Sequence, residues 1–510
     1  MNVGDPNRTG KSTVAEGVGY AHSSDDSRKG KNGSSEGALL QTSIKEVNTT
    51  KLIVMNQDKV EAEGQGEPIK RRRSEIPDAE RVLTLQEKLY QKAKQEREYK
   101  FYVLYDKMFI PYMLREAWKS VKSNQGSPGV DGLTIADVEN YGVEPYLNEF
   151  GEELRKQTYQ PQAVKRVMID KADGGKRPLG IPTVKDRIAQ TVCKMILEPI
   201  FEADFEDSSY GFRPNRSSKD AITAIKENLK QGNTAVYDAD LSKYFDTIPH
   251  DKLLIALKSR IADPRILKLI NKWLKVSVYE DGQFKSGKNN RTGTPQGGVI
   301  SPLLANIYFH LLDRIINNPN SLFSKQGVKI IRYADDFVLM SKSLPVHVTD
   351  KLKELLNRMG LSLNENKTRQ IDAREESFNF LGFAIRFDKD IYGSNDRYWN
   401  IAPSKKSELK IREKVRDFLN THGHFKAQDV AGGLNTIMRG WLNYFEIKGV
   451  SYPAMSKRRL RFYLCECLYR YYNRKSQRKC RLYGQDAFVV LVNQYGLIDP
   501  TKYLKPIARL

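Results

Sequence analysis

The pattern of apolar and polar positions changes three times along the chain. Residues 1 to about 75 are rich in Gly, Ser, Lys and Glu, which predicts a disordered tail because little apolar surface is available to offset ordering entropy. From Pro77 to Ser123 apolar residues recur every three or four positions, which predicts helices. The turn-rich stretch NQGSPGVDGLT, Asn124 to Thr134, ends that helical part.

Between Val164 and Phe387, short apolar runs alternate with helical segments. The runs AVKRVMI, TAVYDAD, KIIRY, FVLM and FNFLGFAIRF predict strands, and the segments RIAQTVCKMILEPIFE and HVTDKLKELLNRMG predict helices. This alternation lacks the regular βαβ repeat of a doubly wound fold, so we expect an α+β fold. Beyond Pro403 the pattern is again mainly helical.

Charge narrows the class of partner. The 510 residues include 84 Lys plus Arg against 62 Asp plus Glu, a net charge of +22, and +14 of it lies between Ile401 and Leu510. This favours a polyanionic partner such as nucleic acid over a small neutral substrate. No apolar run approaches the ~20 residues that span a bilayer. The four cysteines form no C-x-x-C pair, so we expect a reducing compartment and neither a disulfide framework nor a zinc ribbon.

The stretch KIIRYADDFVLM, Lys329 to Met340, places two adjacent carboxylates between two apolar runs. Its local pattern predicts a β-hairpin with Asp335 and Asp336 at the turn. A metal site would need a further oxygen ligand from a neighbouring strand. Asp240 is the candidate, because it ends the run TAVYDAD, 95 residues upstream of Asp335. Taken alone, Asp240 is better explained as a helix N-cap.

These carboxylates stand within a series of motifs that resembles one family. YADD with an upstream D-x-x-x-x-F is similar to the palm of reverse transcriptases, and GTPQGGVISPLLANIYFHLLD resembles a block of group II intron-encoded reverse transcriptase/maturases. KRPLGIPTVKDRIAQ, SSYGFRPNRS, GLSLNENKT and FNFLGF follow the family's order, and GSPGVDG resembles its additional N-terminal block. Their collinearity over residues 80 to 475 carries the resemblance, since a single motif would be weak.

The resemblance implies a right-hand fold in which α+β fingers and palm precede an α-helical thumb or maturase domain. The implied boundaries are a polar tail at 1–75, mainly fingers with a helical extension at 76–235, the palm at 236–390, the thumb/maturase domain at 391–480 and a short tail that could contact DNA at 481–510. Many relatives continue into a Cys/His-containing endonuclease domain. No such ligand set precedes Leu510, so we do not expect second-strand DNA cleavage.

The resemblance also implies roles at the active site. Asp240, Asp335 and Asp336 match the catalytic aspartates, which would hold two Mg²⁺ ions, or Mn²⁺ in their place, with the Leu241 carbonyl as a further ligand.

The residues that match the family's nucleotide pocket are Lys171, Arg177, Phe245, Gln296, Gly297 and Lys367. Lys171 and Arg177, in the fingers, would hold the triphosphate. The Phe245 ring would exclude a ribose 2′-hydroxyl. Gly297 would allow close approach of the backbone, and Lys367 would act as a general acid for pyrophosphate. Without the family, Phe245 would be read as a core residue, P-Q-G-G as a plain turn and Lys367 as a surface lysine.

The C-terminal part interleaves cations with aromatic residues, a composition suited to structured RNA. The string RGWLNYF, Arg439 to Phe445, resembles the family's maturase or thumb domain. We expect most of the aromatic residues, including Trp441 and Tyr444, to form helix core. The candidate RNA-binding residues are the cations Lys457, Arg458, Arg459, Arg461, Arg474, Lys475, Arg478 and Lys479.

Taken together, the resemblance implies an RNA-directed DNA polymerase that binds its group II intron RNA, promotes its splicing and copies it into DNA. Its expected partners are that RNA, a template-primer duplex, target DNA and dNTPs, in a cytoplasmic, nucleoid-associated protein. One alternative is a splicing factor whose polymerase has decayed, which the full set of aspartates with Arg177 and Gln296 disfavours. Another is a reverse transcriptase for defence or diversity generation, which RGWLNYF disfavours.

Overall fold

The structure is a computed structural model that describes residues 76–170, 175–295, 297–390, 396–474, 480 and 482–504. All of them belong to one compact unit, Val47–Leu510. The predicted N-terminal tail lies outside the described residues. No helix among the described residues is long and apolar enough to cross a membrane.

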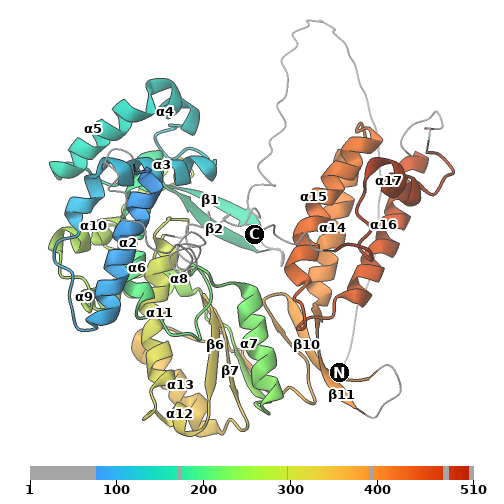
Figure 1. Cartoon of the computed structure of the whole chain (residues 1–510). Helices are drawn as coiled ribbons and strands as arrows, with labels where there is room; N and C mark the ends of the chain where they lie inside the picture. Colours follow the sequence, from blue (N-terminus) through green and yellow to red (C-terminus); the bar gives the residue numbers. More distant parts are fainter. Residues whose placement is uncertain are drawn as a thin grey trace, which may run out of the picture. The chain divides into compact units, whose positions relative to one another are not determined.

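The first part of the described chain is helical (Figure 1). Its elements are α2 (Asp78–Gln95), the 3-10 helix η2 (Tyr105–Phe109), α3 (Pro111–Ser123), α4 (Ile135–Tyr141) and α5 (Val143–Arg155). The helical pattern predicted from Pro77 to Ser123 is confirmed, with a break between α2 and α3. Pro111 begins α3, a position where its missing N–H costs no helical hydrogen bond.

A four-stranded sheet with the order β2-β1-β4-β5 follows. Its strands are β1 (Val164–Asp170), β2 (Lys176–Ile181), β4 (Val278–Glu280) and β5 (Gln283–Lys285). The predicted strand AVKRVMI is confirmed as β1, which pairs with β2 as an antiparallel hairpin. The helices between these strands are α6 (Val184–Glu202), α7 (Ser218–Lys230), α8 (Tyr244–Thr247), α9 (His250–Lys258) and α10 (Pro264–Leu274).

A second sheet, here called the central sheet, has the order β6-β7-β3-β8 and is antiparallel throughout. Its strands are β3 (Ala235–Ala239), β6 (Lys329–Tyr333), β7 (Asp336–Ser341) and β8 (Arg369–Asp372). The predicted hairpin at KIIRYADDFVLM is confirmed as β6 and β7. The neighbouring helices are α11 (Ser301–Asn317), α12 (Leu322–Lys325) and α13 (Val346–Met359).

Both faces of the central sheet are buried. Because side chains alternate along a strand, Phe337 and Leu339 of β7 join the large core that includes α11. Val338 and Met340 join a different cluster, which includes α7. This explains why FVLM is continuously apolar instead of alternating.

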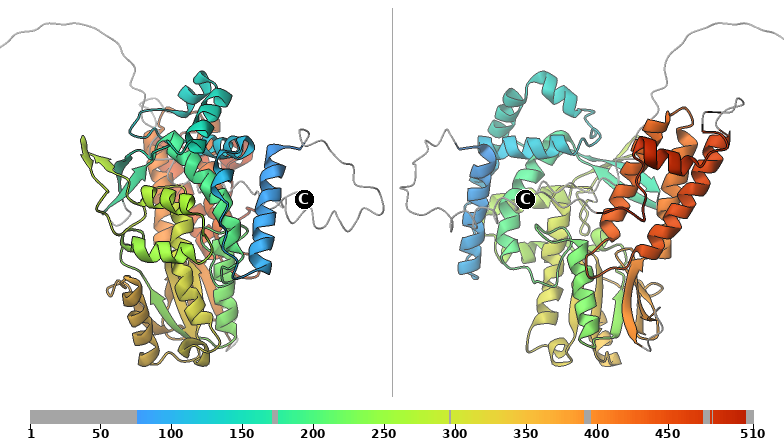
Figure 2. Two further views of the ribbon diagram at one scale, coloured as in Figure 1. Left: turned by 90° about the vertical axis from the view of Figure 1, so that its left-hand side faces the viewer. Right: turned by 45° about the vertical axis from the view of Figure 1, so that its right-hand side comes forward.

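The remaining elements form a three-stranded sheet and a group of helices (Figures 1 and 2). They are β9 (Phe378–Phe380), β10 (Phe383–Lys389), β11 (Arg397–Pro403), α14 (Lys405–Thr421), α15 (Ala427–Phe445), α16 (Ala454–Arg474) and α17 (Ala487–Tyr495). The helical pattern predicted beyond Pro403 is confirmed. The α+β class is confirmed as a mixed α/β part followed by a helical region.

Two lysines of α7 bind the chain at the end of α15. Lys219 Nζ donates to the carbonyl of Asn443 at 2.6 Å. The buried Lys226 Nζ donates to the carbonyls of Gly449 at 2.9 Å and Val450 at 3.1 Å. Cations near a helix C-terminus pair with carbonyls that have no partner within the helix. Helix α7, which packs against the face of the central sheet that carries Val338 and Met340, is therefore also bonded to the end of α15 and the segment after it.

We expect Lys226→Met to lower the free energy of unfolding by about 1–3 kcal/mol, because the carbonyls of Gly449 and of the buried Val450 lose their donor while the aliphatic stem remains. Urea unfolding of the full chain, followed by tryptophan fluorescence, measures the change. Lys230→Met on the same helix is the matched control, since its ion pair with Glu227 is exposed and contributes at most about 1 kcal/mol. Equal losses in both variants would contradict this role of Lys226.

Candidate active site

The β6–β7 hairpin presents two aspartates at its tip. Tyr333 pairs with Asp336, so the turn consists of Ala334 and Asp335. Ala334 has a φ of 59°, which is unusual for a residue with a side chain. Such a conformation costs roughly 1–2 kcal/mol, and the surrounding structure must hold it. A confined turn of two residues therefore fixes the direction in which Asp335 leaves the sheet.

Strand pairing brings Asp240 to the same place. Ala239, the last residue of β3, pairs with Phe337, the second residue of β7. Asp240 therefore follows β3 at the edge of the sheet from which the turn projects. Its backbone carbonyl accepts a hydrogen bond from Asn364 N at 2.8 Å, and Ser242 N donates to Ser362 O at 2.9 Å. These bonds fix the backbone on either side of Leu241, whose side chain is buried.

Charge repulsion among the carboxylates is strong. Desolvation raises the pKa of Asp336 to about 7, with further increases from the charges of Asp335, Asp240 and Asp238. Desolvation also raises the pKa of Asp335, and the charge of Asp240 adds to this, whereas Arg177 lowers it. Asp336 itself is exposed to solvent at the tip of the hairpin, and the negative charges around it oppose its ionisation. A bound positive charge would therefore relieve the repulsion among these carboxylates.

Two predicted cations lie beside this cluster. Lys367 is exposed, and its Nζ lies 3.5 Å from Asp240 Oδ2. Arg177, at the start of β2, is near enough to Asp335 to lower the pKa of that carboxyl. Both side chains come from outside the β6–β7 hairpin, so the fold gathers them from distant parts of the chain.

Phe245 and Gly297 have well-defined surroundings. The Phe245 ring is almost fully buried and packs edge-on against Tyr244 at a centroid distance of 5.6 Å. Gly297 has a φ of 106°, and a Cβ there would lie 2.1 Å from the carbonyl oxygen of Gly180 in β2. Glycine is therefore required at 297 by the approach of its own loop to β2.

Five predicted site residues lie outside the described part of the chain. They are Lys171, Gln296, Lys475, Arg478 and Lys479. Their assignments remain predictions.

Asp238 is an acidic residue near the cluster that the sequence reasoning did not select. It lies two positions before Asp240 on β3, and its charge raises the pKa of Asp336. Its Oδ2 lies 3.6 Å from Arg369 Nε on β8. The spacing of the two aspartates in YDAD could have identified Asp238, because residues two apart on a strand face the same side.

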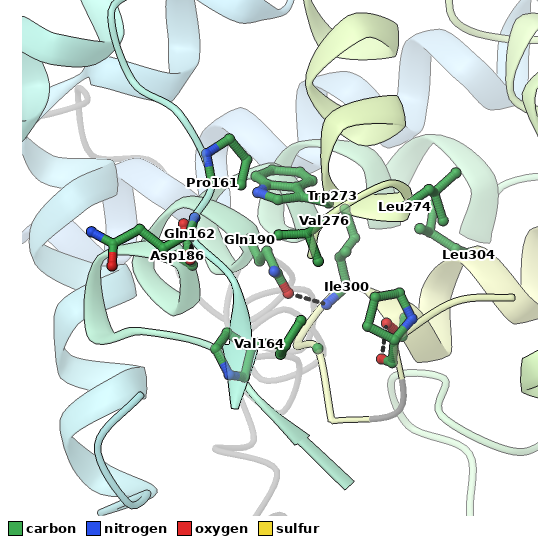
Figure 3. Close-up of a pocket in the computed structure, with 14 residues that line it drawn as sticks. Pro161, Gln162, Val164, Asp186, Gln190, Trp273, Leu274, Val276, Ile300 and Leu304 are labelled. Atoms are coloured by element: carbon green, nitrogen blue, oxygen red, sulfur yellow. Dashed lines mark hydrogen bonds between the residues drawn. The ribbon is translucent and has the colours of Figure 1, made fainter. Parts of the chain in front are cut away.

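One hollow in the described part of the chain is lined by Pro161, Trp273, Leu304 and neighbouring residues (Figure 3). Its lining is mainly apolar, with Trp273 and Ile300 among the residues drawn. The buried Gln190 Oε1 accepts from the backbone N–H of Ile300 at 3.5 Å. The residues that line this hollow do not include Asp240, Asp335 or Asp336.

Comparisons with known proteins agree with the order of these motifs. The family described as "Reverse transcriptase (RNA-dependent DNA polymerase)" matches residues 169–385, and "Group II intron, maturase-specific domain" matches residues 409–484. Protein YkfC of Escherichia coli is 37% identical over 320 residues, which are 56% of this chain and 82% of YkfC. The chain belongs to the group II intron reverse transcriptase/maturase family. It carries a reverse transcriptase domain.

Two further relatives extend the match. The group II intron-encoded protein LtrA of Lactococcus lactis subsp. cremoris is 28% identical over 404 residues, 66% of each chain. The "Uncharacterized 91 kDa protein in cob intron" of Schizosaccharomyces pombe is 28% identical over 419 residues, 68% of this chain and 50% of the relative. The chain thus spans half to about two thirds of these two proteins.

One solved structure also matches part of the chain. A chain of the "Partial Cas6-RT-Cas1--Cas2 complex" matches with a TM-score of 0.31 at 25% identity, covering 49% of this chain and 42% of that chain. A TM-score of 0.31 does not establish a shared fold or function.

Of the five candidate RNA-binding cations that the structure describes, three are held in ion pairs. Lys457 is buried and pairs with Glu446 at 2.8 Å. Arg459 pairs with Glu408 at 3.2 Å, and Arg461 pairs with Asp499 at 3.3 Å. Arg458 and Arg474 are exposed, without an ion pair among the described residues.

Most aromatic residues of the maturase region are core, as predicted. Phe445 is buried, and Trp441 and Tyr444 pack against it. Phe462 and Tyr469 on α16 differ, because both rings are exposed. They lie seven residues apart, which places them on one face of the helix together with Arg458.

The active-site carboxylates fit a hard divalent cation. Carboxylate oxygens are the ligands that Mg²⁺ prefers, and their mutual repulsion would be relieved by positive charge. In the described part of the chain, no three His, Cys, Asp or Glu side chains are grouped closely enough to hold a metal ion by themselves. Mg²⁺ is commonly held by one or two carboxylates together with substrate phosphates, so this grouping is compatible with a site that substrate completes.

We expect Asp336→Asn to stabilise the metal-free protein above pH 7. The Asp336 carboxyl keeps its proton to about pH 7 in the folded chain and loses it near pH 3.8 in the unfolded chain. Raising the pH between these values therefore lowers the free energy of unfolding, and an uncharged Asn avoids this penalty. Thermal unfolding in EDTA should give a Tm roughly 2–4 °C above that of the wild type at pH 8, with the gap closing toward pH 4.

The exposed acid Asp350, which lies beyond the first turn of α13, supplies the control, since Asp350→Asn should leave the Tm and its pH dependence nearly unchanged. A gap for Asp336→Asn that stays constant between pH 4 and pH 8 would show that repulsion at this site is not its cause.

Proposed function

We propose that this protein is an RNA-directed DNA polymerase that binds its group II intron RNA, promotes splicing of that RNA and copies it into DNA during intron mobility. The observation that carries the polymerase half is the convergence of Asp240 with Asp335 and Asp336 at one edge of the central sheet. Packing alone does not require three carboxylates there, since like charges destabilise one another.

In this proposal, Asp240, Asp335 and the Leu241 carbonyl hold two Mg²⁺ ions, with Asp336 beside them. Mg²⁺ bound by these groups would lower the pKa of the primer 3′-hydroxyl and would neutralise charge on the leaving pyrophosphate. Arg177 binds the triphosphate of the incoming dNTP, because its guanidinium suits phosphate oxygens. Lys367 is placed beside Asp240, where its ammonium can protonate or neutralise pyrophosphate.

Two further nucleotide contacts belong to the proposal. The Phe245 ring packs beneath the sugar and excludes a 2′-hydroxyl, for which its buried position next to β3 is suitable. Lys171 and Gln296 complete the pocket for the triphosphate and the base.

The maturase half rests on the family match over residues 409–484 and on the basic composition of the helical region. We propose that Arg458 and Arg474 contact intron RNA phosphates, together with Lys475, Arg478 and Lys479. Lys457, Arg459 and Arg461 are weaker candidates, because binding RNA would require them to leave an acidic partner. Phe462 adds an exposed ring on which an unpaired base can stack.

We expect Asp335→Asn to reduce DNA synthesis by about 10²- to 10³-fold or more, because one ligand of the proposed metal site becomes uncharged. Primer extension on an RNA template with Mg²⁺ and dNTPs measures the rate. Asp251→Asn, which changes an exposed acid, is the control and should retain wild-type synthesis.

The comparison of wild type with Asp335→Asn also distinguishes the proposed polymerase from the main alternative. A splicing factor whose polymerase has decayed would give equally low DNA synthesis in wild type and Asp335→Asn, while both would accelerate splicing of the intron at low Mg²⁺. Failure of the wild type to accelerate splicing of the intron encoded around its own gene would contradict the maturase half.

We expect Arg458→Ala to weaken binding of that intron RNA several-fold, and to reduce the slope of log K against log salt by about one, since one phosphate contact is lost. Arg459→Ala, on the neighbouring residue, should change the affinity less because Glu408 already neutralises its guanidinium. Filter binding of the transcribed intron between about 50 and 200 mM salt measures both. A larger effect of Arg459→Ala would contradict the assignment.

A further inference from the structure

Arg332 is a charged residue with no exposed surface, in the strand that leads into the catalytic turn. It is the largest fully buried side chain of the described residues, and its ion-pair partner Asp313 on α11 is equally buried. Burying two charges is costly, and apolar residues of similar volume often stabilise a fold at least as well. The arrangement therefore calls for an explanation beyond stability.

The guanidinium of Arg332 uses all of its nitrogens. Nε lies 3.0 Å from each carboxylate oxygen of Asp313, and Nη2 lies 2.6 Å from one of them. Nη1 donates to Asn306 Oδ1 at 2.9 Å and to the backbone carbonyl of Ala334 at 2.9 Å. The side chain thus reaches forward from the strand and binds the turn residue that immediately precedes Asp335.

Ala334 is the residue of this turn with the unfavourable backbone conformation, at φ 59°. A carbonyl that accepts a hydrogen bond from a rigid, buried guanidinium cannot rotate freely. Because Ala334 O and the N–H of Asp335 belong to one peptide plane, fixing that carbonyl fixes the plane from which the Asp335 side chain departs.

The loop that precedes α7 is bonded to the end of β6 and also contacts the turn. Arg332 N donates to Ser208 O at 2.9 Å, and Tyr210 N donates to Arg332 O at 2.8 Å. Asn306 Nδ2 donates to Gly211 O at 2.7 Å. A Cβ on Gly211 would lie 2.3 Å from Ala334 N, so the loop contacts the turn directly. Asn306 therefore joins the loop and the guanidinium into one network.

We propose that Arg332 is a positioning residue for catalysis, which together with Asp313 and Asn306 of α11 holds the Ala334–Asp335 peptide in the orientation that metal binding requires. This inference rests on the proposed role of Asp335. Arg332 touches neither substrate nor metal and acts through the Ala334 carbonyl. Only arginine provides three directed contacts from one planar group, so lysine at 332 keeps the charge and loses the bond to the turn.

The first test compares Arg332→Lys with wild type. Affinity for a template-primer duplex should stay within about twofold, whereas the single-turnover rate at saturating dNTP should fall about tenfold or more, since small misplacement of a reacting group can cost up to about 10²-fold. The Mg²⁺ concentration for half-maximal rate should rise. Binding of Mn²⁺ to the protein–template-primer complex, followed by electron paramagnetic resonance, should weaken in parallel and gives a readout that needs no turnover.

The matched control is Arg260→Lys. Arg260 is also buried, also donates to backbone carbonyls, at 2.6 Å to Ala93 and 3.1 Å to Glu96, and also pairs with an acid, Asp204, at 3.1 Å. It holds the C-terminal end of α2 instead of the catalytic turn. Its variant should lose activity only in proportion to any loss of folded protein, with an unchanged Mg²⁺ midpoint.

A second variant guards against misfolding of Arg332→Lys. Arg332→Met with Asp313→Leu removes both buried charges, so no unpaired charge remains and the chain should fold. It should show the same loss of rate and of Mn²⁺ affinity, because the Ala334 carbonyl again lacks its donor. A wild-type rate, or a wild-type affinity for Mn²⁺, in either folded variant would overturn the proposal.

The proposed function fails by a different result. Wild-type protein that lacks Mg²⁺-dependent DNA synthesis would overturn the polymerase assignment. The Mn²⁺ measurement would still decide the role of Arg332, since unchanged affinity in the variants contradicts positioning whether or not DNA is made.

Discussion

The antiparallel pairing of β3 with β7 is the interaction on which the candidate site depends. Its register, with Ala239 opposite Phe337, places Asp240 beside the Ala334–Asp335 turn across a sequence separation of 95 residues. A slip of one residue would send every side chain of β7 to the opposite face. Because β7 contributes to a different core on each face, such a slip would exchange the two sets of apolar residues between cores that are each packed around the other set. Burial thus enforces the position of the carboxylates.

Local patterns in the sequence predicted the hairpin, the α+β class and the helical C-terminal region, because each depends on periodicity within a few residues. The ordered motifs predicted the family. The partners of individual side chains could not be predicted, because they depend on long-range packing. Asp313 lies at the end of a motif taken as a family block, yet its bond to Arg332 becomes visible only once α11 packs against β6. The close approach of Gly297 to Gly180 likewise joins a loop to strand β2, which lies more than 100 residues earlier in the sequence.

The charge of the helical region illustrates the same limit. Counting Lys and Arg identifies a basic part of the chain, but three of the five described candidates are occupied by Glu446, Glu408 and Asp499. Net charge acts at long range and still attracts a polyanion. Specific contacts need cations that are not already paired at close range, so the structure narrows the candidates to fewer positions than composition does.

One apolar cluster joins the central sheet to the three-stranded sheet and to α15. Val338 of β7 shares a cluster with Phe383 of β10 and with Phe445 at the end of α15. The same strand carries Asp336 at its beginning. A displacement of α15 by bound RNA would therefore meet a packed core that includes the strand bearing the candidate catalytic residues, and close-packed cores transmit such strain. That shared core physically connects the proposed RNA-binding helices to the strand that bears the candidate catalytic residues.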